Sequence, residues 1–263
     1  MISVITPVWN GARTIQKCID SVRAQINADY EHIIIDGNSI DNTVAICEHN
    51  LHDKMRILKH RHKCIYEKMN DGIDFANGEW IYFISADDVF ISYDVLQRFA
   101  VYARQFPTKE IIYGDIYSER LNKNVDGEFN NVDVLTRNVP VMFYKKTLFN
   151  KIGYFNIKYK YLSDYDFTMR CWLSGKVSHQ YVPLVTISYA DGGVSSTCKD
   201  RAFKKDHIKN CIMYIVTGGL KIQHKFLLLI LLPIMIIKKK INMPVKQSVS
   251  EVHDRLIRMR YLR

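Results

Sequence analysis

The sequence predicts an α/β fold in which a mostly parallel sheet is flanked by helices. Strand-like and helix-like stretches alternate through the first 118 residues, a pattern typical of parallel βαβ units with right-handed crossovers. The run at 80–84 is apolar on both faces, as in a central strand that is covered on both sides. Strands ending at Thr6, Asp36 and Asp87 would place their ends at one edge of this sheet, where open α/β sheets bind ligands.

Short apolar runs define the N-terminal elements. The first strand is expected at 3–6, because Pro7 should stop it. A second buried strand at 32–35 ends in Asp36, and a weak third strand is expected at 56–58. Two amphipathic helices connect these strands. Their apolar stripes are Ile15, Cys18, Ile19 and Val22 in the first helix, and Val44, Cys47 and Leu51 in the second.

The remaining elements follow the same patterns. A helix with the stripe Met69, Gly72, Ile73 and Ala76 precedes the central strand, and one with Val95, Leu96, Phe99 and Ala103 follows it. Further along the chain we expect a strand at 110–117, a hairpin turn at 122–127, a strand at 139–144, a helix at 146–151 stopped by Gly153, a helix at 164–174 stopped by Gly175, a strand at 180–188 and a polar loop at 191–196.

Composition and charge limit the class of protein. The 263 residues can form one large α/β domain with an appendage, or two small domains. Residues 1–198 carry 22 Lys/Arg against 23 Asp/Glu, whereas residues 199–263 carry 15 against 4, so the basic charge is confined to the C-terminal quarter. The six cysteines form no Cys-x-x-Cys pair, which argues against a zinc site or a disulfide framework and fits a reducing cytoplasm. We also expect no signal peptide before the first strand.

Two adjacent carboxylates, Asp87 and Asp88, follow the central strand after only Ser85 and Ala86. Two acids at a strand end suggest a divalent metal site that carries phosphates. The alternative is that Asp88 caps the next helix and Asp87 is solvated. The chain has no G-x-G-x-x-G, P-loop or G-x-S-x-G motif, and its near-neutral first 198 residues argue against nucleic-acid binding.

Five short motifs occur in order: Thr6-Pro7-Val8-Trp9-Asn10, residues 35–43 (Ile-Asp-Gly-Asn-Ser-Ile-Asp-Asn-Thr), residues 69–73 (Met-Asn-Asp-Gly-Ile), residues 76–80 (Ala-Asn-Gly-Glu-Trp) and residues 85–88 (Ser-Ala-Asp-Asp). Each is weak alone, but their order and spacing together make chance unlikely as an explanation. The series resembles family 2 glycosyltransferases, which have a GT-A fold with a Rossmann-like sheet. It is similar to enzymes that build O-antigen or colanic-acid-type repeat units in bacteria. The resemblance covers the first 120 residues strongly and thins out to about residue 200.

The resemblance implies roles for the strand-end residues. Asp36 matches the acid that binds the uracil or ribose of a UDP-sugar donor, and Thr6 and Pro7 match the turn that lines the nucleotide pocket. Asp87, with Asp88 beside it, matches the site where a divalent metal (Mn²⁺ or Mg²⁺) bridges the diphosphate. Such a metal neutralises the charge that develops on the leaving nucleoside diphosphate.

The resemblance also implies an acceptor site. Asp164 matches the general base that takes the proton of the acceptor hydroxyl in an inverting transfer of a hexose. The alternative is that Asp164 is an ordinary helix cap, and Asp41 is expected to be a structural residue at a helix start. The Gly-Gly-Val-Ser loop at 192–195 resembles a segment that closes over the donor.

The chain departs from the family pattern at three positions. Ser85 stands where many relatives have the first Asp of D-x-D, so metal ligation would rest on Asp87 and Asp88. Ser163 replaces the Glu that usually precedes the base, and Glu67 stands where Asp is common. A non-catalytic nucleotide-sugar-binding subunit of a membrane assembly complex is therefore one alternative, and a sugar-1-phosphate nucleotidyltransferase is another.

The C-terminal region is expected to contact a membrane. We divide the chain into a GT-A domain at 1–200, with a nucleotide-binding half at 1–118 and an acceptor half at 119–200, and a basic helical region at 201–263. Twelve apolar residues at 226–237 are too few for a simple bilayer crossing, and Pro233 disfavours a straight helix. Flanked by lysines, this segment suits the interface of an anionic membrane. The alternative is a helix buried against the domain.

This placement fits the acceptors of the family, which are often sugars on a polyprenyl diphosphate. A lipid-linked saccharide acceptor would place the protein in the cytoplasm, as a peripheral protein at the inner face of the cytoplasmic membrane.

Overall fold

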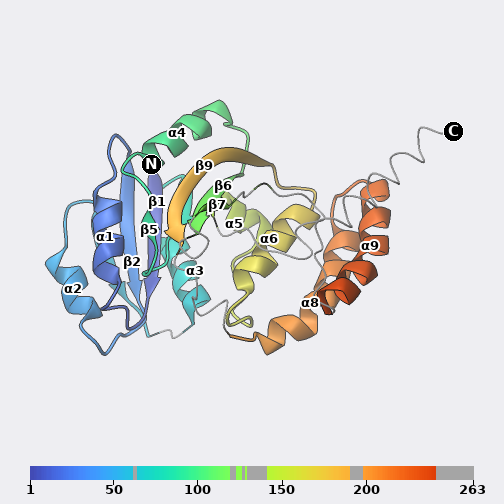
Figure 1. Ribbon diagram of the computed structural model, residues 1–263, viewed down its shortest axis with the longest axis horizontal. Coiled ribbons are helices and arrows are strands. Elements are labelled where there is room, and N and C mark those ends of the chain that lie inside the picture. Colours follow the sequence, from blue (N-terminus) through green and yellow to red (C-terminus); the bar gives the residue numbers. More distant parts are fainter. Residues whose placement is uncertain (62–63, 119–122, 126–127, 129–140, 190–197, 241–263) are drawn as a thin grey trace.

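The computed structural model describes residues 1–61, 64–118, 123–125, 128, 141–189 and 198–240, and the side chains up to residue 233. A curled sheet occupies one half of the molecule, helices cover both of its faces, and the last two helices lie at the far end (Figure 1). The predicted α/β fold, in which helices flank a central sheet, is confirmed. None of the six cysteines, all of which lie in the described ranges, forms a disulfide.

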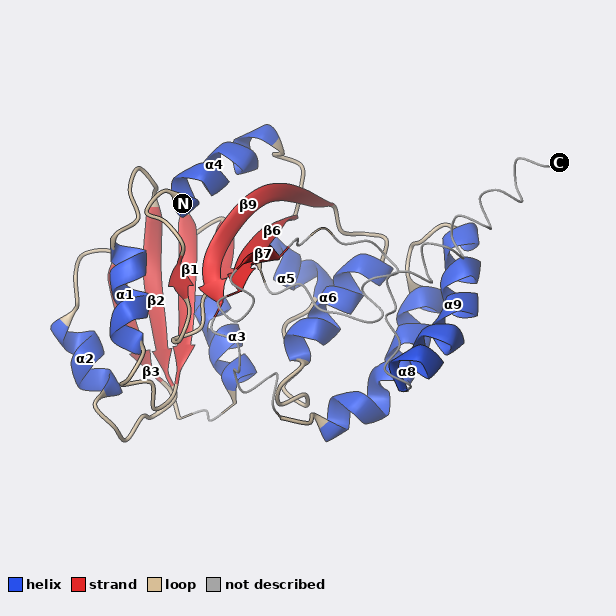
Figure 2. Cartoon of the chain, viewed as in Figure 1, coloured by secondary structure: helices blue, strands red, loops and turns tan. Residues whose placement is uncertain are grey.

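The described strands form one sheet in the order β3-β2-β1-β4-β8-β6-β9-β5, with β7 paired to β6 (Figure 2). Their bounds are β1 Ile2–Val8, β2 Tyr30–Asp36, β3 Met55–Lys59, β4 Trp80–Phe83, β5 Val89–Phe90, β6 Ile111–Ser118, β7 Lys123–Val125, β8 Met142–Lys145 and β9 His179–Tyr189. The helices are α1 Ile15–Arg23, α2 Thr43–His49, α3 Ile65–Phe75, α4 Val95–Gln105, α5 Thr147–Ile152, α6 Ser163–Leu173, α8 Arg201–Thr217 and α9 Ile222–Lys240.

The N-terminal half of the sheet is parallel, as predicted. β1 pairs with β2 along its whole length, from Ile2 opposite Tyr30 to Val8 opposite Asp36, and with β4 on its other side. One prediction is wrong, because Pro7 does not stop the first strand. The ladder between β1 and β4 ends where Ile84 donates to the carbonyl of Ile5, and Pro7 faces this same side beyond the last bond. Its missing N–H therefore leaves no hydrogen bond unmade.

The C-terminal half of the sheet is mixed, which corrects the expectation of continuous parallel βαβ units. β8 pairs antiparallel with both β4 and β6, so it separates these two strands. β9 then adds parallel to β6. Apolar runs predicted the strands at nearly the right places, but a run does not specify which strand it pairs with. The strand β7, at 123–125, lies inside the predicted turn at 122–127. The remaining residues of that turn, and the predicted loop at 191–196, are outside the described ranges.

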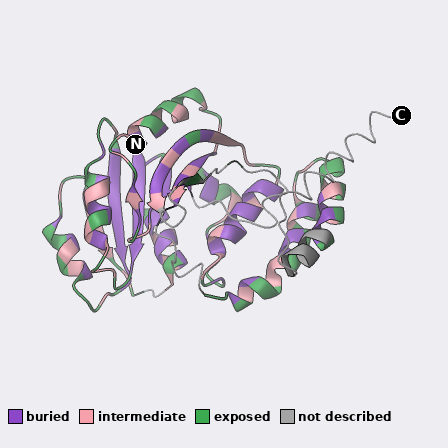
Figure 3. Cartoon of the chain, viewed as in Figure 1, coloured by how far each residue is buried: buried purple, intermediate pink, exposed green. Residues whose placement is uncertain are grey.

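The two faces of the sheet have separate cores (Figure 3). α1 and α4 pack on one face, and all four predicted stripe residues of α1 are fully buried there. α3, α5 and α6 cover the other face, where Ile73 and Phe167 lie in one aliphatic and aromatic core. Leu51 is an exception among the predicted stripes: it is 51% exposed, because α2 ends at His49.

The last two helices share the core of α6. Phe203, Cys211 and Ile215 of α8, and Leu228, Leu231 and Leu232 of α9, are buried in the same cluster as Phe167. α9 continues through Pro233. In the described part of the chain, none of the helices has the length and apolarity needed to span a bilayer. The predicted division at residue 200 stays a prediction, although hydrophobic packing crosses it.

Candidate active site

Two loops at the carboxyl edge of the sheet are fastened to each other. The β1–α1 loop donates from Asn10 N to Ser39 Oγ (2.8 Å), and the β2–α2 loop donates back from Ile40 N to Asn10 Oδ1 (3.0 Å). Asn10 and Asn38 adopt left-handed backbone conformations (φ 52° and 65°), which asparagine tolerates better than most residues. Two further bonds run from Gly11 N to Thr43 Oγ1 (2.8 Å) and from Ala12 N to Asp41 Oδ2 (3.1 Å).

Asp41 is a structural residue in this arrangement, as expected. It also accepts hydrogen bonds from the amide of Thr43 (3.1 Å) and from the Thr43 hydroxyl. Partial desolvation acts to raise the pKa of Asp41, but the hydrogen bonds from Thr43 and Ala12 outweigh it and lower the pKa below its usual value. The two loops at the sheet edge are thus held in one relative position by hydrogen bonds.

Asp36 lies at the last position of β2 and is 2% exposed. Its Oδ2 accepts a hydrogen bond from the amide of Ser39 (3.0 Å), whereas its buried Oδ1 has no hydrogen-bond partner among the described residues. Asp36 does not cap a helix, because α2 begins only at Thr43. A buried carboxylate oxygen without a partner costs free energy, which makes Asp36 a candidate for binding a donor group of a ligand.

Sequence reasoning missed Lys68, which approaches the same edge from α3. Lys68 is 3% exposed, and its Nζ donates to the carbonyl of Val8, the β1 residue paired with Asp36 (3.2 Å). Burial lowers the pKa of Lys68, and the negative charge of Asp36 opposes this effect. The available signal was its spacing: Lys68 stands four residues before Gly72, on the buried face of the helix. An ammonium has three protons, so a single bond leaves Lys68 with donor capacity.

Thr6 is fully buried, and its hydroxyl bonds to His32 Nε2 (2.9 Å). Burial lowers the pKa of His32 to about 3, with His52 adding to the effect, so this imidazole is neutral near pH 7. The side chain of Thr6 therefore has a structural role, because it joins β1 to β2 inside the protein. Pro7 is also buried. The predicted contact of Thr6 and Pro7 with a nucleotide stays a prediction and would have to involve their backbone.

Beyond these residues, the side chain of Trp9 is 52% exposed immediately after β1. Trp9 belongs to the motif at residues 6–10, but the sequence alone assigns no role to its indole. An exposed indole at the sheet edge offers a flat surface on which an aromatic base can stack.

Asp87 and Asp88 follow β4 in a tight turn, closed by a bond from Asp88 N to the carbonyl of Ser85 (3.1 Å). The cap alternative for Asp88 is wrong, since β5 comes next and α4 begins only at Val95. Asp88 is 5% exposed. Burial raises the pKa of the Cys18 thiol to about 12, and the charges of Asp88 and Asp87 add to it, which places this turn beside α1.

The donor set of this turn fits a metal that is held jointly with phosphates. Asp87 is exposed and, within the described residues, makes no hydrogen bond or ion pair. Magnesium in nucleotide sites is commonly held by one or two carboxylates, with phosphate oxygens and water completing its coordination. Among the residues placed in the structure there is no cluster of three or more His, Cys, Asp and Glu that could hold a metal by itself. Asp87 and Asp88 could thus hold a divalent ion together with a diphosphate.

Asp164 lies in the first turn of α6 and is half-buried. Its Oδ1 accepts a hydrogen bond of 2.8 Å from the hydroxyl of Tyr66 in the first turn of α3. Leu162, not Asp164, occupies the cap position of α6, so Asp164 is not the cap residue. A half-buried carboxylate at a helix N-terminus can accept a proton from a bound hydroxyl group.

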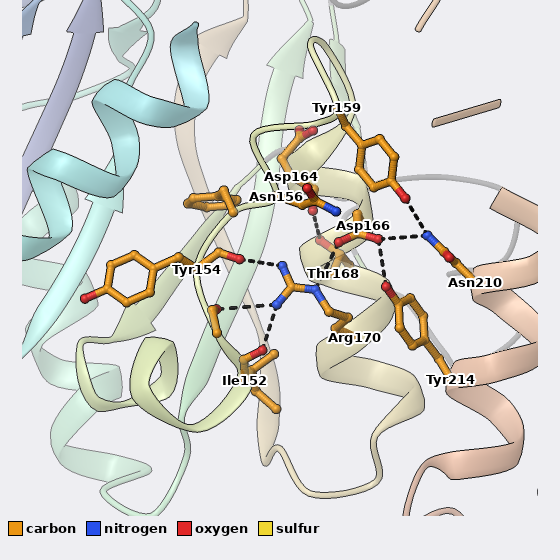
Figure 4. A network of polar contacts seen from close by, with 12 residues as sticks. Ile152, Tyr154, Asn156, Tyr159, Asp164, Asp166, Thr168, Arg170, Asn210 and Tyr214 are labelled. Carbon is orange, nitrogen blue, oxygen red and sulfur yellow. Dashed lines mark hydrogen bonds and ion pairs between the residues drawn. The ribbon is translucent and has the colours of Figure 1, made fainter. Parts of the chain in front are cut away.

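Asp166 fixes α6 to α8 (Figure 4). It is 1% exposed, pairs with Arg170 (3.0 Å) and accepts a hydrogen bond from Tyr214 (2.9 Å) and a weaker one from Asn210 (3.4 Å). Arg170 in turn donates to the carbonyls of Ile152 (2.7 Å) and Tyr154 (2.7 Å). This buried network ties the chain before α6 and the start of the C-terminal region to the helix that carries Asp164.

Removing Asp166 should therefore destabilise the protein more than removing the hydroxyl of Tyr214. We expect Asp166→Ala to lower the free energy of unfolding by about 3–5 kcal/mol, because it leaves Arg170 without its buried counter-charge. Tyr214→Phe removes one hydrogen bond and should cost only about 1 kcal/mol. Urea denaturation followed by circular dichroism measures both, and equal losses in the two variants would contradict the central place of Asp166.

Comparison with known sequences gives consistent results. The model of the family described as "Glycosyl transferase family 2" matches residues 3–168. A "PGL/p-HBAD biosynthesis glycosyltransferase" of Mycobacterium bovis (strain BCG / Pasteur 1173P2) is 34% identical over 212 residues, covering 78% of this chain and 83% of the relative. The "Chondroitin synthase" of Pasteurella multocida is 25% identical over 193 residues, or 68% of this chain and 20% of the relative.

Solved structures share the fold. The 1–349 fragment of S. aureus TarS in complex with UDP-GlcNAc has a TM-score of 0.72 at 18% identity, covering 85% of this chain and 69% of that fragment. The mannosyltransferase PcManGT from Pyrobaculum calidifontis, in complex with GDP-Man and Mn²⁺, has a TM-score of 0.58 at 14% identity, covering 98% of this chain and 80% of that one.

Proposed function

The chain belongs to glycosyl transferase family 2, and on this premise we propose that it transfers a hexose from a UDP-sugar to a saccharide acceptor with inversion. The observation that carries the proposal is the placement of Asp36 at the end of β2 and of Asp87 and Asp88 in the turn after β4, since β2 and β4 are the two strands that flank β1 in parallel. The family assignment favours glycosyl transfer over the nucleotidyltransferase alternative.

Asp36 and Lys68 support a uracil-containing donor. The edge of uracil presents an N–H beside a carbonyl oxygen, which suits the unpartnered Oδ1 of Asp36 and the remaining protons of Lys68. Cytosine presents a ring nitrogen acceptor and an amino group there, so both contacts would be mismatched. Guanine has the same donor–acceptor order as uracil and is the relevant competitor. Trp9 would stack on the base.

Replacing Lys68 should weaken nucleotide binding and reduce its selectivity. We expect Lys68→Met to lower the affinity for UDP about tenfold and to reduce the ratio of UDP affinity to CDP affinity, because the variant loses one hydrogen bond to the nucleobase. Isothermal titration with UDP, CDP and GDP measures this. Unchanged UDP affinity in Lys68→Met, with a normal melting temperature, would exclude Lys68 from the donor site.

Asp87 and Asp88 would hold a divalent metal at the diphosphate. A bound metal supplies positive charge that stabilises the leaving nucleoside diphosphate. Asp87, which has no competing bond within the described residues, is the ligand that is ready to bind, while Asp88 holds the turn against α1. Ser85 supplies no carboxylate, so the metal affinity depends on this pair and on the nucleotide.

Asp164 would act as the general base. As the acceptor hydroxyl attacks the anomeric carbon from the face opposite the diphosphate, its proton passes to the Asp164 carboxylate, and the bond to the diphosphate oxygen breaks. One displacement of this kind inverts the configuration at the anomeric carbon. The hydrogen bond from Tyr66 and the network around Asp166 hold the base on a rigid helix.

Asp164→Asn should reduce sugar transfer by at least about 100-fold, because an amide cannot accept the proton, whereas donor binding should persist. Asp87→Ala should weaken the dependence of UDP-sugar binding on manganese. Transfer from labelled UDP-sugars with and without Mn²⁺, combined with calorimetry, measures both effects. Wild-type rates in both variants would refute the proposal. Binding without turnover by the wild-type protein on every lipid-linked acceptor would instead support the non-catalytic alternative.

The C-terminal helices support a lipid-linked acceptor at a membrane. α8 exposes an apolar stripe at Ile208, Ile212 and Val216, and α9 exposes one at Ile222, Phe226 and Ile230, each at four-residue spacing. The region from 199 onward carries the excess of basic residues. Apolar stripes with basic neighbours suit an anionic bilayer interface. We propose that the protein acts at the inner face of the cytoplasmic membrane, in the synthesis of a bacterial surface polysaccharide such as O-antigen.

Vesicle sedimentation tests this surface. The protein should bind vesicles that contain phosphatidylglycerol, bind those of pure phosphatidylcholine weakly, and dissociate as salt screens the charges. The double variant Phe226→Ser with Ile230→Ser should bind less, because it removes the apolar contact. Val101→Ser, at an exposed apolar position on α4, serves as the matched control. Equal binding by all three proteins would contradict the assignment.

A further inference from the structure

One face of helix α3 carries polar side chains that contact Asp164 and the segment before it. Tyr66, Asn70 and Asp74 are spaced four residues apart, so they lie on one face of the helix. Asn70 exchanges two hydrogen bonds with the backbone of Phe155 (3.0 and 3.1 Å), and Asp74 accepts one from the hydroxyl of Tyr154 (2.5 Å). Tyr66, at the N-terminal end of the stripe, reaches Asp164 itself (2.8 Å).

The hydroxyl of Tyr66 is a fixed hydrogen-bond donor. Tyr66 is 4% exposed, and its ring packs against Phe155, with 5.8 Å between ring centroids. Burial raises the pKa of Tyr66 well above its usual value, and the negative charge of Asp164 adds to this effect. The phenol therefore keeps its proton across the physiological range, and its hydrogen bond to the carboxylate persists in every protonation state in which the enzyme would work.

We propose that Tyr66 is a positioning residue for the general base. Its hydrogen bond to Oδ1 fixes the rotation of the Asp164 carboxylate, which takes the proton of the acceptor hydroxyl. The proton of Tyr66 stays on Tyr66 throughout. This inference rests on the proposed function, because it assigns to Asp164 the role of base. It also gives the Ile-Tyr-x-x-Met-Asn segment at 65–70 a physical role, since Tyr66 and Asn70 both hold the part of the chain that presents Asp164.

A neighbouring tyrosine provides a matched control. Tyr165 is 5% exposed and follows Asp164 directly, but its buried hydroxyl has no hydrogen-bond partner in the part of the chain that the structure describes. Tyr66→Phe and Tyr165→Phe thus remove the same atom from two similarly buried side chains, and only Tyr66 bonds to the base. A general effect of removing a buried hydroxyl would appear in both variants, whereas loss of positioning would appear only in Tyr66→Phe.

Steady-state transfer from a labelled UDP-sugar tests the proposal in the full-length protein. We expect kcat of Tyr66→Phe to fall about 10- to 100-fold, as for loss of a hydrogen bond to a charged group, with the donor KM unchanged within about twofold. Tyr165→Phe should keep the wild-type kcat. Calorimetric titration with UDP and a melting curve confirm that Tyr66→Phe is folded and binds its donor. A wild-type kcat in Tyr66→Phe, or equal losses in both variants, would overturn the proposal.

A double-mutant cycle separates positioning from a structural role. If Tyr66 acts through Asp164, adding Tyr66→Phe to Asp164→Asn should cause no further loss of the residual rate. Independent, multiplying losses would overturn the inference and leave Asp164 as the base. Wild-type activity in Asp164→Asn alone would instead refute the base assignment of the proposed function, so the two failures are distinguishable.

Discussion

The in-register parallel pairing of β1 with β2 and β4 is the constraint on which the candidate site depends. Val8 lies opposite Asp36 in this ladder, β4 ends opposite Ile5, and the turn after β4 brings Ala86 close to Gly11, so three segments distant in sequence meet at one edge. A slip of one residue would turn Asp36 to the other face of the sheet. The apolar faces of β1 and β2 prevent such a slip, because both are fully buried. Hydrophobic packing thereby fixes the position of a buried carboxylate.

Buried charged side chains, and not strand pairing, hold helix α6, which carries the candidate base Asp164, in place. Asp200 caps α8 through the amide of Phe203 (3.0 Å) and also accepts a hydrogen bond from the amide of Tyr161 just before α6 (2.8 Å). Asp166 joins the same two helices from within. Buried ion pairs contribute little net stability compared with apolar packing, but they are costly to misplace. They therefore specify the orientation of α6, whose first turn carries Asp164.

The acids of the site were predictable because they interrupt strong patterns. Asp36, Asp87 and Asp164 each stand where an apolar run or a helix begins or ends, and an ordered set of motifs assigned them roles. Lys68 was missed because a lysine is usually read as solvated, although its spacing to Gly72 places it on the buried face of α3. The insertion of β8 between β4 and β6, and the 98-residue separation between Tyr66 and Asp164, are long-range contacts that no local pattern contains.

Helix α3 connects the two halves of the candidate site. Lys68 and Tyr66 are two residues apart, so their side chains leave the helix about 200° apart, on nearly opposite sides. One reaches the end of β1 beside Asp36, and the other reaches Asp164. Because a single helical turn carries both contacts, rigid backbone sets the spacing between Lys68, which would bind the nucleobase, and Tyr66, which bonds to the carboxylate that would take the proton. A shift of α3 would therefore displace both contacts together.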